Sequence, residues 1–334
     1  MRVRKPGLFT TIQDSGRFGY QSLGVPPSGA LDEYSFKIAN MLVSNNEDCA
    51  CLECTLIGPE LEFEEDTKFA VAGGKFEVFF NERKIEERKI EEWRSYDAKT
   101  GDVLVVKKAI SGCRCYVAFS GGIDVPLIMN SRSTYTKGNI GSVVKGRILL
   151  RNKKVTFNKV LNKRYMPSYE NKIGLRVVLG PQDDHFTSTG INAFLNEGYK
   201  ITKSADRMGY RLEGKPIELK SSEIISDGVP LGAVQVPGNG QPIILLKDRQ
   251  TTGGYPKIAT VVTPDIPKVA QAKSGDVIRF KTVSMEEAHS IYTKYYEKFE
   301  EIKTSLEEPK GRRFRMIIDG KEYHIEVEEI LVMS

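Results

Sequence analysis

The chain has 334 residues, 40% of them hydrophobic and 28% charged, and 49 Lys and Arg against 44 Asp and Glu give a formal net charge of +5. This composition, with a mean hydropathy of −0.33, excludes a disordered chain, and the length suits two domains. The mild, interspersed charge without a basic stripe argues against nucleic-acid binding. No apolar run approaches the ~18 residues of a membrane span. The basic start is not followed by an apolar segment, so we expect no signal peptide and a cytoplasmic location.

The predicted elements are mostly short strands with few helices. A first helix is expected over residues 31–42, where apolar side chains recur on one face. Runs of β-branched or aromatic residues bounded by glycine, proline or polar residues predict strands. These runs are 69–72, 76–80, 102–106, 115–119, 176–179, 242–246 and 257–262. The chain as a whole is therefore expected to be mainly β.

Helices are expected at two later places, and two further segments suggest hairpins. Residues 186–195 have helical spacing, and the capping box formed by Ser284 and Glu287 opens a helix that runs to about residue 308. The charged run 84–92 is interpreted as a solvated hairpin edge. Residues 313–329 alternate in polarity around an Asp-Gly pair, which predicts two strands and a tight turn.

An internal repeat organises the chain. Three short matches recur in the same order, which indicates two similar domains. The matched pairs are 17–20 with 207–210, 24–26 with 228–230, and 99–103 with 273–277. We predict a first β-barrel domain over residues 1–157, a linker at 158–172, a second β-barrel domain at 173–283, and a C-terminal helix and hairpin tail at 284–334.

The five cysteines are interpreted as buried small hydrophobes and not as a metal site. Three of them are crowded into residues 49–54, and Cys113 and Cys115 form a second close group. A C-x-C pair on a strand places both thiols on one face, and no histidine lies near either group. We therefore predict no metal. The phosphate-loop, nucleophile-elbow, H-E-x-x-H and strand-linked G-x-G-x-x-G motifs are also absent.

The densest polar segments are residues 226–242 and 248–256, each next to an apolar strand. Polar residues gathered at strand ends suggest the mouth of a site. Arg249 could grip a planar carboxylate or phosphate, Asp248 could move a proton, and the backbone at Thr251 could face an anion. The alternative is a tight turn with a structural Asp–Arg pair. Asp and Arg also recur together at 14–17 and at 206–207, where a duplicated structural ion pair is the leading interpretation.

Six motifs resemble one known family. They are residues 7–17 (GLFTTIQDSGR), 24–32, 52–59, 131–135, 204–211 (SADRMGYR) and 248–256 (DRQTTGGYP). Together they resemble the KipA family, which is the carboxyltransferase subdomain A and B family, also called the C subunit of 5-oxoprolinase and often labelled allophanate hydrolase subunit 2. The resemblance covers about residues 1–290. It implies two cyclophilin-like β barrels, in agreement with the repeat.

The resemblance also implies an activity and partners. It implies one subunit of an ATP-dependent enzyme that opens 5-oxoproline to glutamate together with an A and a KipI-like B subunit, the chain being inactive alone. We predict Asp248 and Arg249 as catalytic. The predicted substrate-binding residues are Gln250, Thr251, Gln235, Asn239, Arg207 and Tyr210. ATP is expected in the complex, without a defined site on this chain.

Two other functions remain open at this point. One is the carboxyltransferase part of a biotin-dependent, urea carboxylase-like enzyme, since the tail hairpin resembles the opening hairpin of a biotin carrier domain. The tail has no Met-Lys-Met biotinylation sequence, so we expect no biotin attached to this chain. The other is a non-catalytic protein that sequesters a KipI-like kinase inhibitor.

Overall fold

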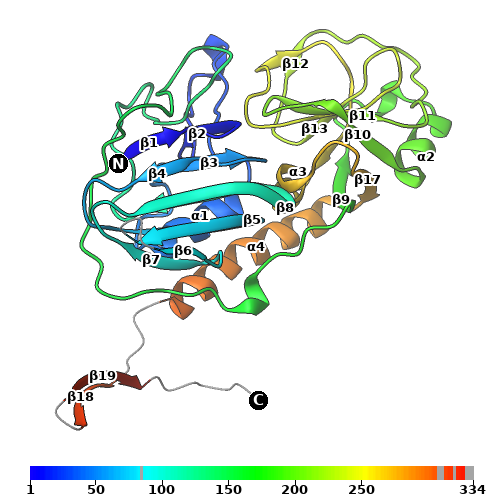
Figure 1. Cartoon of the computed structure of the whole chain (residues 1–334). Helices are drawn as coiled ribbons and strands as arrows, with labels where there is room; N and C mark the ends of the chain where they lie inside the picture. Colours follow the sequence, from blue (N-terminus) through cyan, green and yellow to red (C-terminus); the bar gives the residue numbers. More distant parts are fainter. Residues whose placement is uncertain (83–85, 307–311, 319–320, 328–334) are drawn as a thin grey trace.

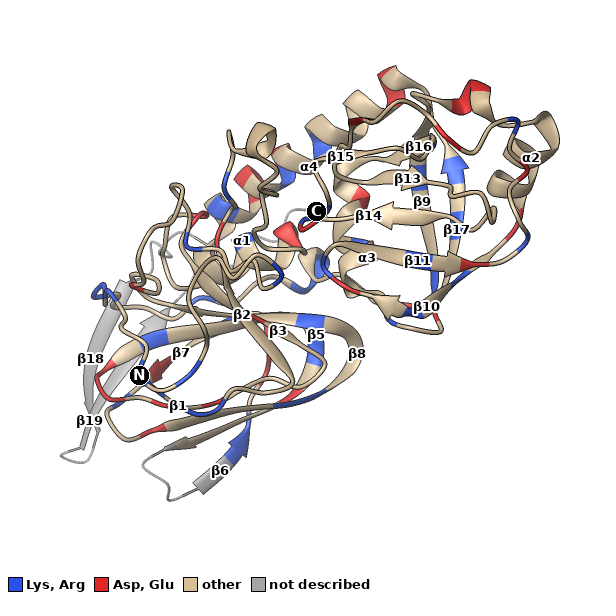
Figure 2. Ribbon diagram, turned by 90° about the horizontal axis from the view of Figure 1, so that it is seen from above, with Lys and Arg blue, Asp and Glu red and all other residues tan. Residues whose placement is uncertain are grey.

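The computed structural model describes residues 1–82, 86–306, 312–318 and 321–327. Two β lobes lie side by side, and the long helix α4 (Met285–Ser305) runs along both of them (Figure 1). Basic and acidic residues are interspersed over both lobes (Figure 2), as the sequence predicted. None of the helices in the described ranges is both long and apolar enough to cross a membrane.

The first lobe is built on one strongly bent sheet. Its strand order is β1-β4-β8-β3-β2, and β5 pairs with β8, β7 and β6. The strands are β1 (Arg2–Lys5), β2 (Phe9–Gln13), β3 (Cys51–Thr55), β4 (Glu60–Glu62), β5 (Thr67–Glu82), β6 (Glu86–Lys89), β7 (Arg94–Ala98) and β8 (Val103–Phe119). Aromatic side chains, including Phe63, Phe69, Phe80 and Phe119, fill the concave side.

Four strands predicted in this lobe are in fact two long ones. Residues 69–72 and 76–80 both lie in β5, and 103–106 and 115–119 both lie in β8. The pairing register shifts between Gly73 and Val78, so the two strands bend together without ending. Gly73 has φ +123°, and a Cβ there would lie 2.6 Å from the Arg114 carbonyl oxygen. The polar and glycine residues that suggested a break therefore mark a bulge.

The second lobe is a closed seven-stranded barrel of order β10-β11-β14-β13-β16-β9-β17. Its strands are β9 (Lys172–Leu179), β10 (Tyr199–Ala205), β11 (Gly209–Glu213), β13 (Ala233–Gln235), β14 (Ile243–Leu245), β16 (Lys257–Val261) and β17 (Val277–Thr282). A short ribbon of β12 (Asp227–Gly228) and β15 (Thr252–Gly253) lies beside it. The predicted mainly β fold with two barrel-like lobes is confirmed, and the first lobe is a half-barrel.

The repeat at 99–103 and 273–277 forms the same turn in both lobes. The Asp102 carboxylate accepts a hydrogen bond from the Lys99 amide at 2.7 Å, and Asp276 accepts one from the Lys273 amide at 2.9 Å. Each turn has a glycine with positive φ and leads directly into a strand, β8 or β17. The duplication is thus visible in side-chain geometry as well as in sequence.

The helices begin and end at recognisable caps. The α helices are α1 (Glu33–Leu42), α2 (Ser188–Asn196), α3 (Ile266–Gln271) and α4, and short 3-10 turns are η1 (Gln21–Leu23), η2 (Lys163–Tyr165), η3 (Asp183–His185) and η4 (Thr263–Asp265). Asp32 caps α1 by accepting from the Ser35 amide at 3.0 Å. The capping box predicted at Ser284 and Glu287 is confirmed, with 3.1 Å and 2.9 Å hydrogen bonds.

The two lobes interlock through buried side chains. Leu31, which comes just before α1 of the first lobe, belongs to the core of the second barrel. Phe299 and Ile302 of α4 pack instead in the layer between α1 and the outer face of the first sheet. The segment predicted as a linker also packs against the first lobe, because Leu161 and Tyr165 are buried in that same layer.

The tail and the charged run are described only in part. Strands β18 (Arg312–Ile318) and β19 (Lys321–Val327) pair antiparallel, which confirms the two predicted tail strands. The Asp319–Gly320 turn lies outside the described residues. Strand β6 pairs with β5 alone, so it is an edge strand as expected, and residues 83–85 of the charged run lie outside the described residues.

Candidate functional site

The turn between β10 and β11 divides its side chains between two environments. Arg207 and Tyr210 are buried where the two lobes meet. Asp206 and Arg211 instead line an open pocket at the edge of the second barrel. Asp206 fixes the turn, since its Oδ1 accepts from the backbone amides of Met208 and Gly209 at 2.8 and 3.2 Å. One short motif therefore serves both an interior network and an exposed site.

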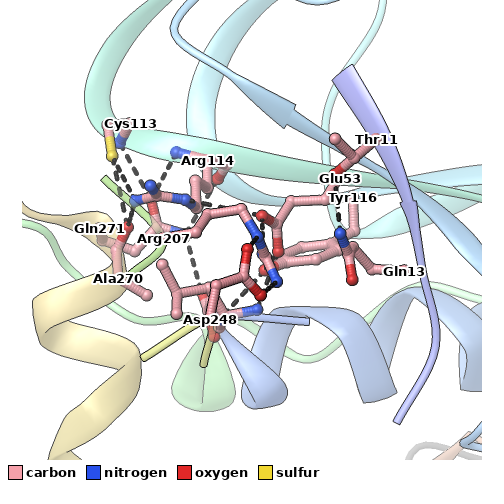
Figure 3. Close-up of polar contacts among 12 residues, drawn as sticks. Thr11, Gln13, Glu53, Cys113, Arg114, Tyr116, Arg207, Asp248, Ala270 and Gln271 are labelled. Carbon is pink, nitrogen blue, oxygen red and sulfur yellow. Dashed lines mark hydrogen bonds and ion pairs between the residues drawn. The ribbon is translucent and has the colours of Figure 1, made fainter. Parts of the chain in front are cut away.

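Arg207 is the centre of the interior network (Figure 3). Its Nε and Nη2 donate to the two carboxylate oxygens of Asp248 at 3.0 and 3.2 Å. Its Nη1 donates to Glu53 of strand β3, and its Nη2 also donates to the Gly29 carbonyl at 2.6 Å. Arg207 and Asp248 are each only 5% exposed. The guanidinium thus joins a carboxylate of its own lobe to a carboxylate of the first lobe.

Glu53 is fully buried and lies between two arginines. Besides Arg207 it has Arg114 of β8, whose Nε is 3.8 Å from Oε1. Glu53 Oε2 accepts from the Leu31 amide at 2.8 Å and from the Tyr116 hydroxyl at 2.7 Å. Burial alone would raise the pKa of Glu53, but the two arginines and these hydrogen bonds outweigh it and hold the pKa below its usual range. The two arginines and the two carboxylates balance in charge.

Gln271, at the end of α3, closes the network from the second lobe. Its Oε1 accepts from the amides of Cys113 and Arg114, both at 3.0 Å. Its Nε2 donates to Asp32 at 2.6 Å and to the Arg114 carbonyl at 2.9 Å. Arg114 Nη1 in turn donates to the Tyr210 hydroxyl at 2.7 Å. Buried polar groups from both lobes therefore satisfy each other, which is the condition under which burying them is tolerated.

These contacts place three of the predicted site residues inside the protein. Asp248 and Arg207 form the structural type of Asp–Arg pair considered in the sequence, although the partner of Asp248 is Arg207 and not the adjacent Arg249. Tyr210 also donates to the Ala272 carbonyl at 3.2 Å. A catalytic role for Asp248 stays a prediction, and it would require the pair with Arg207 to open. In the observed arrangement these three residues fix the interface between the lobes.

The other predicted residues lie nearer the surface, and three of them share a pocket. Gln235, Asn239 and Gln250 line a cavity of about 610 Å³. The remaining lining residues come mainly from β10, β11, β14 and the loops beside them: Lys203, Ser204, Ala205, Asp206, Met208, Gly209, Arg211, Pro237, Ile243, Leu245 and Tyr255, with Lys137 from the first lobe. We call this cavity the barrel-mouth pocket. Its size lies in the usual range for small-molecule sites.

The amide side chains in the barrel-mouth pocket are held in a chain. Gln250 Nε2 donates to Gln235 Oε1 at 3.2 Å, and Gln235 Nε2 donates to the Tyr255 carbonyl at 3.3 Å. Gly253 lies directly against them, since a Cβ at that position would be 2.7 Å from Gln235 Nε2. The amides are thus oriented by contacts within residues 235–255, and a side chain at position 253 would displace them.

The pocket carries an excess of positive charge. Lys203 and Arg211 line it without an ion-pair partner among the described residues, whereas Lys137 pairs with Asp206 at 2.7 Å. Burial would raise the pKa of Asp206, but the hydrogen bonds from Lys137 and from the backbone amides of the turn outweigh it and lower that pKa. Asp206 is therefore an anion that is already neutralised, and two cations remain for an anionic ligand.

Arg249 and Thr251 do not line this pocket. Arg249 Nε donates to the Val229 carbonyl at 2.7 Å and its Nη1 donates to the Leu246 carbonyl at 3.1 Å. Burial lowers the pKa of Arg249 to about 10. It has no carboxylate partner among the residues that the structure describes, so its predicted role as an anion anchor is untested. Thr251 contributes its carbonyl oxygen to the Val229 amide at 3.0 Å.

The cysteines are mostly interior, as predicted. Cys51, Cys54, Cys113 and Cys115 are buried and Cys49 is partly exposed, all as free thiols. Cys54 and Cys115 are directly opposite each other on β3 and β8, and burial raises the pKa of Cys115 well above its usual value. Within the described ranges, no group of three or more His, Cys, Asp or Glu side chains is arranged to hold a metal ion.

Sequence reasoning did not single out Glu53, Arg114 or Arg211. The first two are lone charges within otherwise apolar strands, and a buried charge requires a partner. Opposite charges in two such strands were therefore a usable signal, since β3 and β8 are neighbours in the sheet. Arg211 follows the 204–210 repeat at an alternate strand position, but nothing in the sequence shows that Gln235 and Gln250 would face it.

Comparisons with known proteins agree with this structure. The chain matches the family described as carboxyltransferase domain, subdomain A and B, over residues 23–282. It is 35% identical over 295 residues to the 5-oxoprolinase C subunit of Escherichia coli, covering 86% of this chain and 93% of that protein. It is 34% identical over 291 residues to the 5-oxoprolinase C subunit of Haemophilus influenzae, covering 85% and 91%.

A solved structure shares the fold. The crystal structure of the K. lactis urea amidolyase matches with a TM-score of 0.83 and 32% identity over 90% of this chain, which corresponds to 20% of that much longer protein. The bent sheet and the closed barrel are therefore found together in a multidomain enzyme as well. On the extent of these matches, the chain belongs to the family of carboxyltransferase domains with subdomains A and B.

Proposed function

We propose that this chain is one subunit of an ATP-dependent 5-oxoprolinase, which converts 5-oxoproline to glutamate together with other subunits. One observation carries the proposal: the similarity to the 5-oxoprolinase C subunit of E. coli extends over 93% of that protein. The urea amidolyase match, in contrast, covers only 20% of its protein. The length of this chain therefore fits a separate polypeptide of a complex better than a part of a fused enzyme.

The barrel-mouth pocket suits this substrate chemically. 5-Oxoproline carries a carboxylate and a lactam, so it needs cationic donors at one end and amide-type partners at the other. Arg211 and Lys203 supply the cations, and Gln235 and Gln250 supply amide donors and acceptors. In this proposal Arg211 holds the carboxylate and the two glutamines face the lactam. Asn239 lines the same wall.

The reaction also needs activation that these residues do not supply. Hydrolysis of an unactivated lactam requires a way for the carbonyl oxygen to leave, and phosphorylation by ATP provides one. The chain has no phosphate-loop sequence, and the pocket presents donors for binding and for charge stabilisation. We therefore assign ATP to the assembled complex and propose an A and a KipI-like B subunit as partners, with the site completed at their interface.

Reconstitution tests the proposal directly. Phosphate release should depend on 5-oxoproline, require all three subunits, and be undetectable with this chain alone. The partners should also protect residues 248–256 from hydrogen exchange, since the loop that carries Gln250 and Tyr255 faces the shared site. Full turnover by the isolated chain would refute the shared site. Binding of the partners without turnover in any mixture would favour the regulatory alternative.

The K. lactis structure favours a second candidate, carboxyl transfer to a urea-like substrate. A ureido group presents the same amide donors and acceptors to Gln235 and Gln250, but it lacks the carboxylate that Arg211 would bind. Activity that is sensitive to avidin and requires urea would support this candidate. Activity with 5-oxoproline that avidin does not affect would exclude it.

A further inference from the structure

A second cavity lies on a different part of the molecule from the barrel-mouth pocket. It has a volume of about 410 Å³ and is enclosed where α1, the segment before β9, α3 and α4 meet. The lining residues are Asp32, Tyr34, Tyr165, Met166, Pro167, Ser168, Tyr169, Glu170, Lys172, Ile173, Gly174, Pro264, Pro267, Lys268, Gln271, Ala272, Tyr295 and Lys298. We call it the junction pocket. It shares no residue with the barrel-mouth pocket.

Two tyrosine hydroxyl groups in the junction pocket are buried without a partner. The Oη atoms of Tyr169 and Tyr295 make no hydrogen bond within the described part of the chain. A buried hydroxyl left unpaired costs about 1–3 kcal/mol. Tyr34, between them in the lining, differs, because its hydroxyl donates to the Tyr165 carbonyl at 2.6 Å. The pocket thus keeps two donors that its own walls do not satisfy.

A half-buried cation accompanies these donors. The Lys298 ammonium group lies 5.0 Å from the ring centre of Tyr34 and 5.8 Å from that of Tyr165, and it has no ion-pair partner among the described side chains. Burial lowers the pKa of Lys298. Lys268, in contrast, is paired with Asp265 at 2.9 Å. Lys298 is therefore the lining cation that an anion inside the pocket would neutralise.

The acidic groups of the pocket do not cancel this charge. The Asp32 carboxylate is committed, since it accepts from Ser35 at 3.0 and 2.6 Å and from Gln271 at 2.6 Å. Burial raises the pKa of Asp32. Glu170 is exposed at the outer edge. Donors therefore exceed available acceptors in the interior, and the walls that remain are aromatic rings and prolines.

We propose that the junction pocket is a second ligand site that binds a small organic carboxylate, with the anion held by the Lys298 ammonium and the hydroxyls of Tyr169 and Tyr295. The body of the ligand lies against the rings of Tyr34 and Tyr165. Because α1 and α4 belong to one side of the pocket and α3 to the other, an occupied pocket links the two lobes. Binding is therefore expected to stabilise the folded chain as well.

Binding of matched acids and amides tests the proposal. The probes are benzoate, phenylacetate, succinate and glutamate, each compared with its neutral amide, measured by calorimetry and by the thermal midpoint of the full chain. The measurements use the Arg211→Ala protein, in which the barrel-mouth pocket has lost its carboxylate anchor. At least one carboxylate should bind at one site and raise the midpoint, and its amide should bind about tenfold more weakly or not at all.

Single-atom variants locate the bound carboxylate. Tyr295→Phe and Lys298→Met should each weaken binding of that carboxylate about tenfold. Tyr292→Phe, on the same helix but facing a different groove, is the matched control and should bind as the parent does. Because Tyr295→Phe removes only an unpaired hydroxyl, the chain should fold with unchanged or slightly higher stability. Absence of binding by every probe, equal binding of acid and amide, or binding that both variants leave unchanged would overturn the proposal.

Discussion

The interior network and the barrel-mouth pocket use the same stretches of sequence in opposite ways. Around the β10–β11 turn, Arg207 faces inward and pairs with Asp248, whereas Arg211 faces the pocket without a carboxylate partner among the described residues. Around residue 250, Asp248 is buried and Gln250 lines the pocket. Both regions are rich in charge and amide groups, but only the first has all its charges matched.

The difference separates the residues that hold the lobes together from those that are available to a ligand. A matched set of buried charges gains nothing from a further ion and resists disruption, because removal of one member leaves another uncompensated. An unmatched cation on an open wall costs little and can bind an anion. Density of polar residues therefore indicates where to look, and partner counting indicates what each residue does.

Replacement of Glu53 by Gln should have the largest effect and tests the structural side of the comparison. It leaves Arg207 and Arg114 with one carboxylate between them, so we expect unfolding free energy to fall by about 3–5 kcal/mol in urea denaturation. Glu60→Gln is the control, because that glutamate forms ion pairs with Lys5 and Arg4 at the surface and should cost less than about 1 kcal/mol. Equal losses in the two variants would show that the network does not stabilise the interface.

Acid should remove the contribution of Glu53 in a defined direction. Its pKa is lowered on folding, whereas in the unfolded chain it lies near about 4.3. Its contribution to stability is therefore complete above that unfolded value and is lost as pH falls through the lower folded value. The stability difference between the wild type and Glu53→Gln should be constant from about pH 7 to 5 and shrink at lower pH. A difference that grows on acidification would contradict the assignment.

Arg211→Ala tests the binding side. It should lower kcat/KM for 5-oxoproline in the reconstituted complex roughly 10- to 100-fold, since a hydrogen bond to a charged group contributes about 1.5–3 kcal/mol. The thermal midpoint should stay unchanged, because Arg211 is exposed. Arg279→Ala, an exposed arginine on β17 outside the pocket, is the matched control. A lowered midpoint with retained activity would move Arg211 to the structural group.

Gly253→Ala sharpens the comparison at the amide chain. The new methyl group would lie 2.7 Å from Gln235 Nε2, so the two glutamines must shift. We expect activity to fall about tenfold with a small change in stability. Gly228→Ala is the matched control on the paired strand, where a Cβ would meet nothing within 4 Å. Equal activity of both variants would remove the glutamines from the site.

Lys137→Ala should have the smallest effect. Its ion pair with Asp206 joins side chains that are 54% and 53% exposed, so stability should change by less than about 0.5 kcal/mol. The KM for 5-oxoproline should change no more than about threefold, and the change should diminish with salt, because exposed charges are screened. A tenfold effect that persists at high salt would place Lys137 in direct contact with the substrate.

Much of the fold was predictable because it depends on local pattern. Alternation and β-branched runs identified the strands, the repeat identified the shared turns, and the capping residues identified α1 and α4. The long strands β5 and β8 were not predicted, since a bulge at Gly73 and a chain break have the same local sequence signature. Of the predicted site, Gln235, Asn239 and Gln250 share the pocket, whereas Arg207, Tyr210 and Asp248 lie inside.

What the sequence determined by itself was the set of residues that matter: polar loops after apolar strands, repeated in two lobes, with the motifs of one family. Only the tertiary structure decided which member of each motif is matched and which is free. The physical reason is that a charge is defined by its neighbours, and here they come from far along the chain. Glu53 meets Arg207 across 154 positions, and Asp32 meets Gln271 across 239. No local pattern contains those pairings, because closure of the two lobes upon each other creates them.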